Sequence, residues 1–292
     1  MKTVLVTGAS GQLGKCLQKI AENDHSIDWL FMDSSEIDIT SKCDISMCFG
    51  SKQIDYCINC AAYTNVEKAE SEKEKAFSIN AEAVKNLAEI CKAHKTILIH
   101  ISTDYVFDGK GNTKYKEEDI TNPINVYGAS KLKGEEYIKE IIGYYFIIRT
   151  SWLYSEYGHN FYKTILNKAS EKSALNITTT QKGTPTNANH LAELLIKIMK
   201  EESVQYGLYN FSNAGETSWY DFAKEILKVS GNSDEIILNK DNSYKTIAAR
   251  PEYSVLDKSK LKYNFQIEVS SWQDALLELH NNYYNEINNL NV

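Results

Sequence analysis

The chain has 292 residues and a formal net charge of −7 at pH 7. This acidic balance and the lack of a basic cluster argue against nucleic acid as a partner. No apolar run approaches the roughly 20 residues that span a bilayer, and the apolar run at the N-terminus is too short for a secretory signal. The sequence therefore predicts a cytoplasmic protein. Its 42% hydrophobic residues are enough to fill the core of one large domain or two.

The N-terminal segment predicts a strand, a glycine-rich turn and a helix, in that order. An apolar, β-branched run opens the chain and is typical of a buried parallel strand. Gly8, Gly11 and Gly14 follow at the spacing Gly-x2-Gly-x2-Gly. Such a turn brings backbone N–H groups and the helix dipole close to a pyrophosphate. We therefore expect a dinucleotide site here, with a plain tight turn as the alternative.

An acidic residue follows the second predicted strand, which covers residues 28–32. Asp33 stands where a carboxylate commonly accepts hydrogen bonds from the adenosine ribose. No arginine follows it to hold a 2′-phosphate, so the sequence favours NADH over NADPH. Asp38 and Ile39 could lie beside the adenine. A surface aspartate in a turn is the alternative interpretation of Asp33.

Further strands are predicted at residues 54–60, 96–101 and 145–149, with a long helix from 72 to 94 between the first two. The small residues Ala61 and Ala62 follow the first of these strands and would let a cofactor approach the backbone. The alternation of strands and helices predicts an α/β fold with a doubly wound parallel sheet.

Two segments carry candidate catalytic side chains. Thr103 follows the strand at 96–101, where its hydroxyl could bond a substrate carbonyl or could belong to a turn. Tyr127 and Lys131 lie one turn apart on a helix that begins near Asn125. A nearby ammonium lowers the pKa of a phenol toward the working range of an acid–base catalyst. A solvated tyrosine–lysine pair on an amphipathic helix is the alternative.

The second half of the chain predicts a smaller α/β lobe. Helices are expected near 160–172, 187–200, 218–229 and 271–286, separated by short strands. We expect a dinucleotide-binding domain at 1–151 and a mainly substrate-binding lobe at 152–292, with some segments returning to the first domain. Cys57 and Cys60 are expected to be buried strand thiols, because alternation would point them to opposite faces.

The motifs in this order resemble the extended short-chain dehydrogenase/reductases and, among them, the dTDP-4-dehydrorhamnose reductase family. The resemblance runs essentially end to end. It rests on the glycine turn and on the segments 59–70, 102–109, 125–132, 149–154, 160–161, 183–186 and 219–223.

This resemblance implies a Rossmann-type fold and the NAD(P)H-dependent reduction of a dTDP-sugar ketone at C4, the last step of dTDP-L-rhamnose synthesis. It implies that Tyr127 donates a proton to the C4 oxygen and that Lys131 holds the nicotinamide ribose and lowers the pKa of Tyr127. Thr103 would polarise the C4 carbonyl. The implied cofactor site also includes Gly8, Gly11, Gln12, Leu13, Gly14, Asp33, Asp38, Ile39, Ala61, Ala62 and Tyr63. The implied substrate site includes Val66, Thr103, Asp104, Trp152 and Asn160.

Some members of this family bind Mg²⁺ at a dimer interface through acidic residues. The corresponding stretches here, Lys15-Cys16 and Asn189-His190, supply no carboxylate, so the sequence predicts no metal and leaves a homodimer open. Two other functions remain as alternatives. One is reduction of another 4-keto-6-deoxy nucleotide sugar, and the other is a non-catalytic NAD(P)-binding role similar to that of the regulatory subunit of methionine adenosyltransferase.

Overall fold

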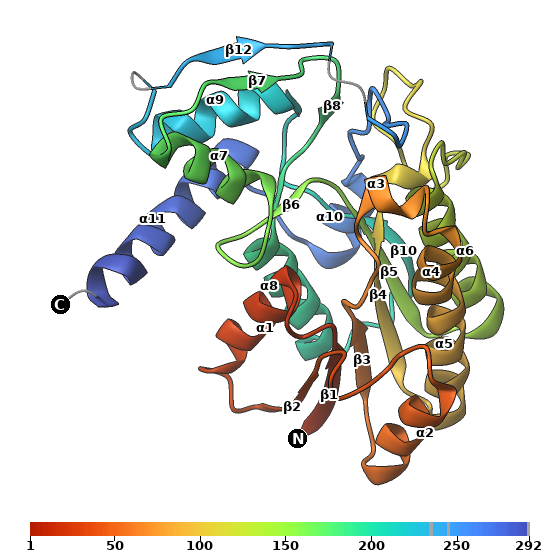
Figure 1. Ribbon diagram of the computed structural model, residues 1–292. Helices are drawn as coiled ribbons and strands as arrows, with labels where there is room; N and C mark the ends of the chain where they lie inside the picture. Colours follow the sequence, from red (N-terminus) through yellow and green to blue (C-terminus); the bar gives the residue numbers. More distant parts are fainter. Residues whose placement is uncertain (234–235, 244–245, 291–292) are drawn as a thin grey trace.

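A parallel sheet forms the centre of the molecule (Figure 1). The computed structural model describes residues 1–233, 236–243 and 246–290, with side chains up to residue 283. The sheet has six strands in the order β10–β5–β4–β3–β1–β2, and every neighbouring pair is parallel. The doubly wound parallel fold predicted from the sequence is confirmed. The strands are β1 (Lys2–Thr7), β2 (Ile27–Met32), β3 (Tyr56–Asn59), β4 (Ile97–Thr103), β5 (Tyr145–Thr150) and β10 (Gly207–Asn210).

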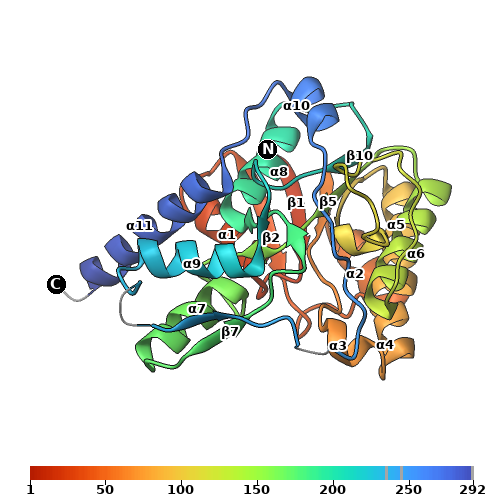
Figure 2. The same ribbon diagram turned by 90° about the horizontal axis from the view of Figure 1, so that it is seen from above.

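Helices cover both faces of this sheet, as Figure 2 shows from above. On one face lie α1 (Gln12–Ala21) and α8 (Ala188–Lys200), and on the other lie α2 (Lys42–Ser51), α5 (Ala83–His94) and α6 (Val126–Ile141). Side chains alternate across a strand. Val4 and Val6 therefore join the apolar core under α1 and α8, while Leu5 joins the core under α5. Burial on both faces explains why the strands are apolar almost throughout.

A second apolar core holds the smaller lobe, which the sequence predicted as an α/β substrate lobe. Tyr154, Tyr162, Phe222 and Trp272 are buried in it. The lobe is built from α7 (Phe161–Ser170), α9 (Trp219–Val229), α11 (Trp272–Leu290) and the paired strands β7 (Leu175–Ile177) and β12 (Leu238–Lys240). No helix in the described part of the chain is long and apolar enough to cross a membrane.

Short elements connect the two lobes. The strand β6 (Leu153–Tyr154) pairs with β9 (Thr186–Asn187), and β8 (Lys182–Gly183) pairs with β11 (Thr217–Ser218). The helix α10 (Ser259–Phe265) lies near β10. Both β10 and α8 come late in the sequence, but β10 is an edge strand of the central sheet and α8 covers one face of it. The chain therefore passes between the lobes more than once. The domain boundary at residue 151 stays a prediction.

The helix predicted over 72–94 is present as an unbroken helical run, but it contains a turn that was not predicted. It consists of α4 (Lys73–Phe77), a π-helical segment η1 (Ser78–Glu82) and α5. The side chain of Asn80 lies in this segment, accepts from the Tyr63 N–H at 2.9 Å and donates to the Tyr63 carbonyl at 3.0 Å. It also donates to Ser130 Oγ on α6 at 3.0 Å. The irregular turn thus aims one amide at the loop after β3 and at α6, a use typical of π-bulges near functional sites.

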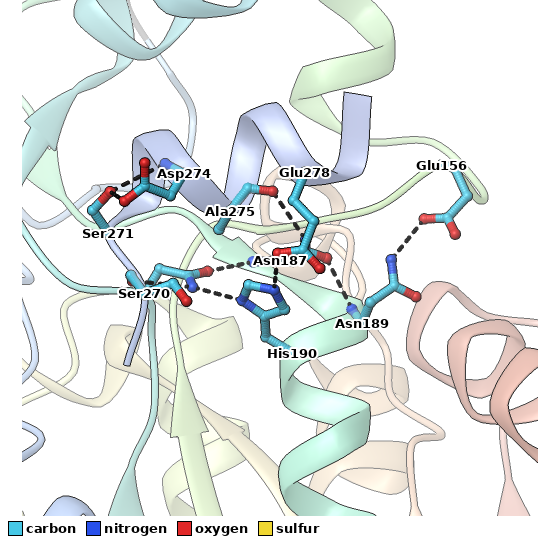
Figure 3. A network of polar contacts seen from close by, with 10 residues as sticks. Glu156, Asn187, Asn189, His190, Ser270, Ser271, Asp274, Ala275 and Glu278 are labelled. Carbon is cyan, nitrogen blue, oxygen red and sulfur yellow. Dashed lines mark hydrogen bonds and ion pairs between the residues drawn. The ribbon is translucent and has the colours of Figure 1, made fainter. Parts of the chain in front are cut away.

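A network of polar side chains joins α8 to the second lobe (Figure 3). His190 Nε2 lies 3.1 Å from the Glu278 carboxylate of α11, and its Nδ1 lies 2.9 Å from Asn213 Nδ2. Asn189 Nδ2 donates to Glu156 at 3.0 Å. The sequence stretch Asn189-His190 carries no carboxylate, but the fold brings two to it. Among the described residues, no three His, Cys, Asp or Glu side chains are grouped to hold a metal ion, and the absence of a metal stays a prediction.

Candidate active site

A cavity of about 880 Å³ lies at the carboxyl ends of the strands, between the sheet and the second lobe. It opens where the strand order reverses between β1 and β3, the position at which ligands bind in sheets of this kind. Of the predicted site residues, only Tyr63 is not part of its lining. The Tyr63 hydroxyl instead donates to Glu72 at 3.1 Å. The predicted residues that line the cavity are Gly8, Gly11, Gln12, Leu13, Gly14, Asp33, Asp38, Ile39, Ala61, Ala62, Val66, Thr103, Asp104, Tyr127, Lys131, Trp152 and Asn160.

The glycine turn forms one end of the cavity. Gly8 has a φ of +68°, and a Cβ there would lie 2.6 Å from the Ala61 nitrogen. A Cβ on Gly14 would lie 2.5 Å from the Ala9 carbonyl oxygen. The helix α1 begins after Gly11 without a side-chain cap, so its first N–H groups face the cavity side of the turn. This cradle fits the pyrophosphate of a dinucleotide.

Two carboxylates stand at the far edge of this turn. Asp33 Oδ1 accepts from Ser35 N at 2.8 Å and from Ser35 Oγ at 2.6 Å, which lowers the pKa of Asp33 below its ordinary value. Asp38 is held in the same way by Thr40. Both groups are therefore ionised acceptors at neutral pH, as the binding of ribose hydroxyls requires.

The start of α6 places Tyr127 beside the end of β4. Asn125 caps this helix by accepting from the Gly128 N–H at 2.7 Å. A Cβ on Gly128 would lie 2.1 Å from the Tyr105 carbonyl oxygen, so only glycine lets the helix approach this closely. The ring of Tyr127 meets that of Tyr105 edge-on at 5.8 Å, and its hydroxyl interacts with the Thr103 side chain.

The pKa of Tyr127 differs from the sequence expectation. Burial raises it above the ordinary value, and the interaction with Thr103 only partly opposes the rise. The lowering effect expected of Lys131 is not among the causes of this shift and stays a prediction. The Lys131 Nζ donates to the Ile101 carbonyl at 2.6 Å and lies 3.2 Å from His100 Nε2. Burial lowers the pKa of Lys131 itself to about 8. Tyr127 is therefore a phenol at neutral pH, the form that can give up a proton.

Asp104 places a carboxyl next to these groups. It is buried, and burial raises its pKa to about 7. Thr103 Oγ1 donates to Asp104 Oδ1 at 3.2 Å, and the Ser254 side chain lies close enough to oppose the rise in pKa, but Oδ2 has no partner within ordinary hydrogen-bond geometry among the described residues. A buried polar oxygen without a partner is costly. Because Asp104 lines the cavity, a ligand hydroxyl is well suited to satisfy it.

An aromatic wall closes the cavity on the side of the second lobe. Trp152 has a φ of +47° and stacks on Trp219, with ring centroids 3.6 Å apart and planes 8° from parallel. A Cβ on Gly183 would lie 2.6 Å from the Trp152 ring. A positive φ is strained for a tryptophan, and such strain gathers at functional sites. Packing against Trp219 and Gly183 holds the ring in this position.

Asn160 lines the cavity but uses its polar atoms within the protein. Its Oδ1 caps α7 by accepting from Lys163 N at 3.0 Å. Its Nδ2 donates to Gln12 Oε1 at 2.9 Å and to the Ser155 carbonyl at 2.8 Å. Asn160 therefore ties the glycine turn to the second lobe, which is a different use from the predicted contact with substrate.

Sequence reasoning missed a cation in this cavity. Arg250 lines it and donates to the Glu67 carboxylate at 2.7 Å, while its Nε is buried without a partner among the described residues. Glu67 also accepts from the Ile247 N–H at 2.8 Å and so fixes the loop that carries Arg250. No local sequence pattern indicates the pairing of Arg250 with Glu67, because the two residues are far apart in the chain. Other lining residues that were missed include Tyr105, His159, Phe161 and Trp219.

Comparison with known proteins places this geometry in a family. Residues 1–285 match the family model described as the RmlD substrate binding domain. A dTDP-4-dehydrorhamnose reductase of Aggregatibacter actinomycetemcomitans is 41% identical over 286 residues, covering 94% of this chain and 97% of that protein. A probable dTDP-4,6-dihydroxy-2-methyloxan-3-one 4-ketoreductase of Streptomyces antibioticus is 32% identical, covering 94% and 93%.

A solved structure agrees with these sequence relatives. The crystal structure of a dTDP-4-dehydrorhamnose reductase from Bacillus anthracis in complex with NADP superimposes with a TM-score of 0.90 at 36% identity. The match covers 96% of this chain and 99% of that one. The sequence resemblance is thereby confirmed, and the chain belongs to the RmlD substrate binding domain family.

Proposed function

We propose that this protein reduces the C4 ketone of dTDP-4-dehydro-6-deoxy-L-mannose to give dTDP-L-rhamnose, with NADH or NADPH as the reductant. The observation that carries the proposal is one cavity that holds a dinucleotide cradle at one end and Thr103, Tyr127 and Lys131 at the other. The relatives named as reductases of this sugar support it.

The chain's own residues account for the chemistry at C4. When bound, the nicotinamide supplies a hydride. Tyr127, a buried phenol, donates its proton to the oxygen that gains charge as the ketone is reduced. The Thr103 hydroxyl, which donates to Asp104 Oδ1 in this structure, would turn its proton to the same oxygen when substrate is bound. Lys131 lies one helical turn from Tyr127 and binds the nicotinamide ribose.

The nucleotide sugar is proposed to occupy the side of the cavity near the second lobe. Asp104 would bond a sugar hydroxyl through its unpartnered oxygen, and Val66 and Trp152 would enclose the sugar ring. Arg250 supplies a positive charge for the diphosphate, since a guanidinium with a free N–H suits phosphate oxygens. Gln12 and Asn160 would link this half to the cofactor half.

A second candidate has the same chemistry on another sugar. The relative from Streptomyces antibioticus is named as a probable 4-ketoreductase of a different dTDP-linked ketosugar. Thr103, Tyr127 and Lys131 would serve either substrate. The non-catalytic regulatory role is not favoured, because the cavity keeps all three side chains together.

The test is the oxidation of reduced nicotinamide by the purified protein, followed by its absorbance. With dTDP-4-dehydro-6-deoxy-L-mannose we expect turnover with kcat/KM in the range of about 10⁴ M⁻¹s⁻¹ or more, as is usual for enzymes on their own substrate. Turnover of another 4-keto-6-deoxy nucleotide sugar, whether dTDP-, UDP- or GDP-linked, without turnover of this one would favour the second candidate. No turnover with any ketosugar would contradict the proposal.

The setting of the reaction belongs to the same proposal. We place it in the cytoplasm. We expect NADH to be the better reductant, because Asp33 stands at the ribose end of the cradle.

A homodimer stays a prediction. Sedimentation of the purified protein with and without EDTA tests both the dimer and the predicted absence of a metal.

A further inference from the structure

A row of polar side chains crosses three strands of the sheet beneath the candidate active site. Thr7 on β1 is in register with Asn59 on β3, and Asn59 is in register with His100 on β4. Residues paired across neighbouring strands point to the same face. All three therefore face the α6 side of the sheet, and the row ends at Lys131.

The contacts along this row are continuous. Thr7 Oγ1 lies 2.7 Å from Asn59 Oδ1, and Asn59 Nδ2 lies 3.1 Å from His100 Nδ1. His100 Nε2 lies 3.2 Å from Lys131 Nζ. All four side chains, those of Thr7, Asn59, His100 and Lys131, are at most 2% exposed. The row is thus a buried chain of hydrogen bonds that leads to one ammonium group.

The row stands out against the strands that carry it. Two residues earlier on the same strands, and on the same face, the positions in register are Leu5, Cys57 and Leu98. These three are fully buried apolar residues. Buried polar groups are costly unless each finds a partner. The change from an apolar to a polar row occurs at the level of Lys131, which suggests that it serves that residue and not the packing of the sheet.

The donors and acceptors of the row can be arranged in two ways. Burial and the neighbouring ammonium hold the pKa of His100 well below its ordinary value, so its ring is neutral and carries one N–H. A charged Lys131 can only donate. His100 Nε2 must then accept, Nδ1 carries the proton, and the Asn59 amide turns its oxygen toward the ring.

A neutral Lys131 allows every bond of the row to reverse. Its lone pair can accept from Nε2–H, so Nδ1 becomes the acceptor and the Asn59 NH₂ group turns toward the ring. The Thr7 hydroxyl then donates to the Asn59 oxygen, which is the order of donors in this structure. The second arrangement has one proton fewer, lost to solvent. It also has the other tautomer of His100, the Asn59 amide turned by half a turn and the Thr7 hydroxyl rotated.

We propose that His100 is a positioning residue for Lys131, and that the row Thr7–Asn59–His100 accepts the hydrogen bond of the charged lysine and reverses when that charge is lost. A neutral acceptor holds the Nζ in place without adding a negative charge beside it. Lys131 Nζ also donates to the Ile101 carbonyl at 2.6 Å, and the carboxylate of Glu135 on α6 and the Cys60 thiol after β3 act on its charge. Glu135 is itself paired with Arg149 at 2.7 Å.

The direct test reads the tautomer of His100 in the protein without ligands. The ¹⁵N shifts of the ring distinguish a protonated from an unprotonated nitrogen, and His100→Gln assigns the signals among the six histidines. We expect a protonated Nδ1 while Lys131 is charged, and a protonated Nε2 above the pKa of Lys131, near pH 8. Lys131→Met should abolish the change. Shifts that stay constant between about pH 6 and about pH 10 would overturn the proposal.

A second test uses turnover and rests on the proposed function. Removing the acceptor in His100→Leu disfavours the charged lysine, so the alkaline limb of kcat/KM should move to lower pH by about one unit, a tenfold change on that limb. His100→Gln, which keeps an acceptor, should restore part of the shift. His25→Gln makes the same substitution at an exposed histidine and should leave the profile unchanged.

The outcomes of the two tests are separable. A loss of rate in His100→Leu that is equal at every pH would mean that the residue only supports the fold, and would contradict the proposal. If the protein reduces no ketosugar, the proposed function fails, whereas the tautomer change in the unliganded protein is still expected.

Discussion

Thr103→Val should show how much the Thr103 hydroxyl contributes to the rate, apart from the other active-site groups. Valine has nearly the same shape but cannot donate to the oxygen that gains charge at C4. Removing one such donor typically lowers kcat by about 10²–10³, equivalent to roughly 2.7–4 kcal/mol of transition-state stabilisation. The Thr103 hydroxyl also accepts from the Tyr105 N–H at 3.2 Å, so the variant leaves that donor without its partner. We expect an additional cost of about 1–3 kcal/mol in the free energy of unfolding.

Steady-state kinetics and thermal unfolding together check this prediction. If the hydroxyl acts mainly in the transition state, kcat and kcat/KM fall by similar factors. Thr103→Ser keeps the hydroxyl and is the matched control, with activity expected within about tenfold of the original. A Thr103→Val variant with nearly full activity, or a Thr103→Ser variant as impaired as valine, would refute the role assigned to this hydroxyl.

Three further predictions concern the cofactor cradle and the buried carboxyl. Gly8→Ala places a Cβ 2.6 Å from the Ala61 nitrogen at a φ of +68°. It should weaken NADH binding by more than about tenfold in a fluorescence titration. An unchanged Kd would contradict the fit of the glycine turn to the pyrophosphate. Asp33→Ala should reduce the preference for NADH over NADPH in paired kcat/KM measurements. A tenfold NADPH preference in the unaltered protein, roughly 1.4 kcal/mol, would refute the argument from Asp33. Asp104 has a pKa of about 7, above that of an unfolded aspartate, so its contribution to stability is present at low pH and lost as the pH rises through about 7. Relative to Asp104→Asn, the unaltered protein should therefore lose unfolding free energy between about pH 4, the pKa of an unfolded aspartate, and about pH 7 in denaturant titrations, and parallel curves would be the contrary result.

Local spacing made much of this structure predictable. The glycine turn, the strands and the pair Tyr127–Lys131 each depend on residues a few positions apart, and the structure places them around one cavity. Some local elements were nevertheless missed, among them α2 and α10. The helix α2 buries only Ile45 and Phe49 and so has a narrow apolar stripe, although Ser41 at its start, which accepts from the Asp44 N–H, was a readable capping signal.

Features that depend on distant residues could not be predicted in this way. The π-helical segment exists because Asn80 bonds the Tyr63 backbone and Ser130 of another helix. Arg250 reaches the cavity through Glu67, which precedes it by 183 positions. The pKa of Tyr127 was misjudged for a related reason, since helical spacing gives its distance to Lys131 but not the burial that dominates it.

The central claim is that Tyr127 donates the proton to the C4 oxygen of a dTDP-linked ketosugar. Tyr127→Phe removes only the hydroxyl and should leave NADH binding within about threefold of the original. With dTDP-4-dehydro-6-deoxy-L-mannose as substrate, we expect the original protein to oxidise NADH and the variant to lose kcat by more than the loss in Thr103→Val, about 10³-fold or more. Comparable kcat values for the two proteins would contradict the account.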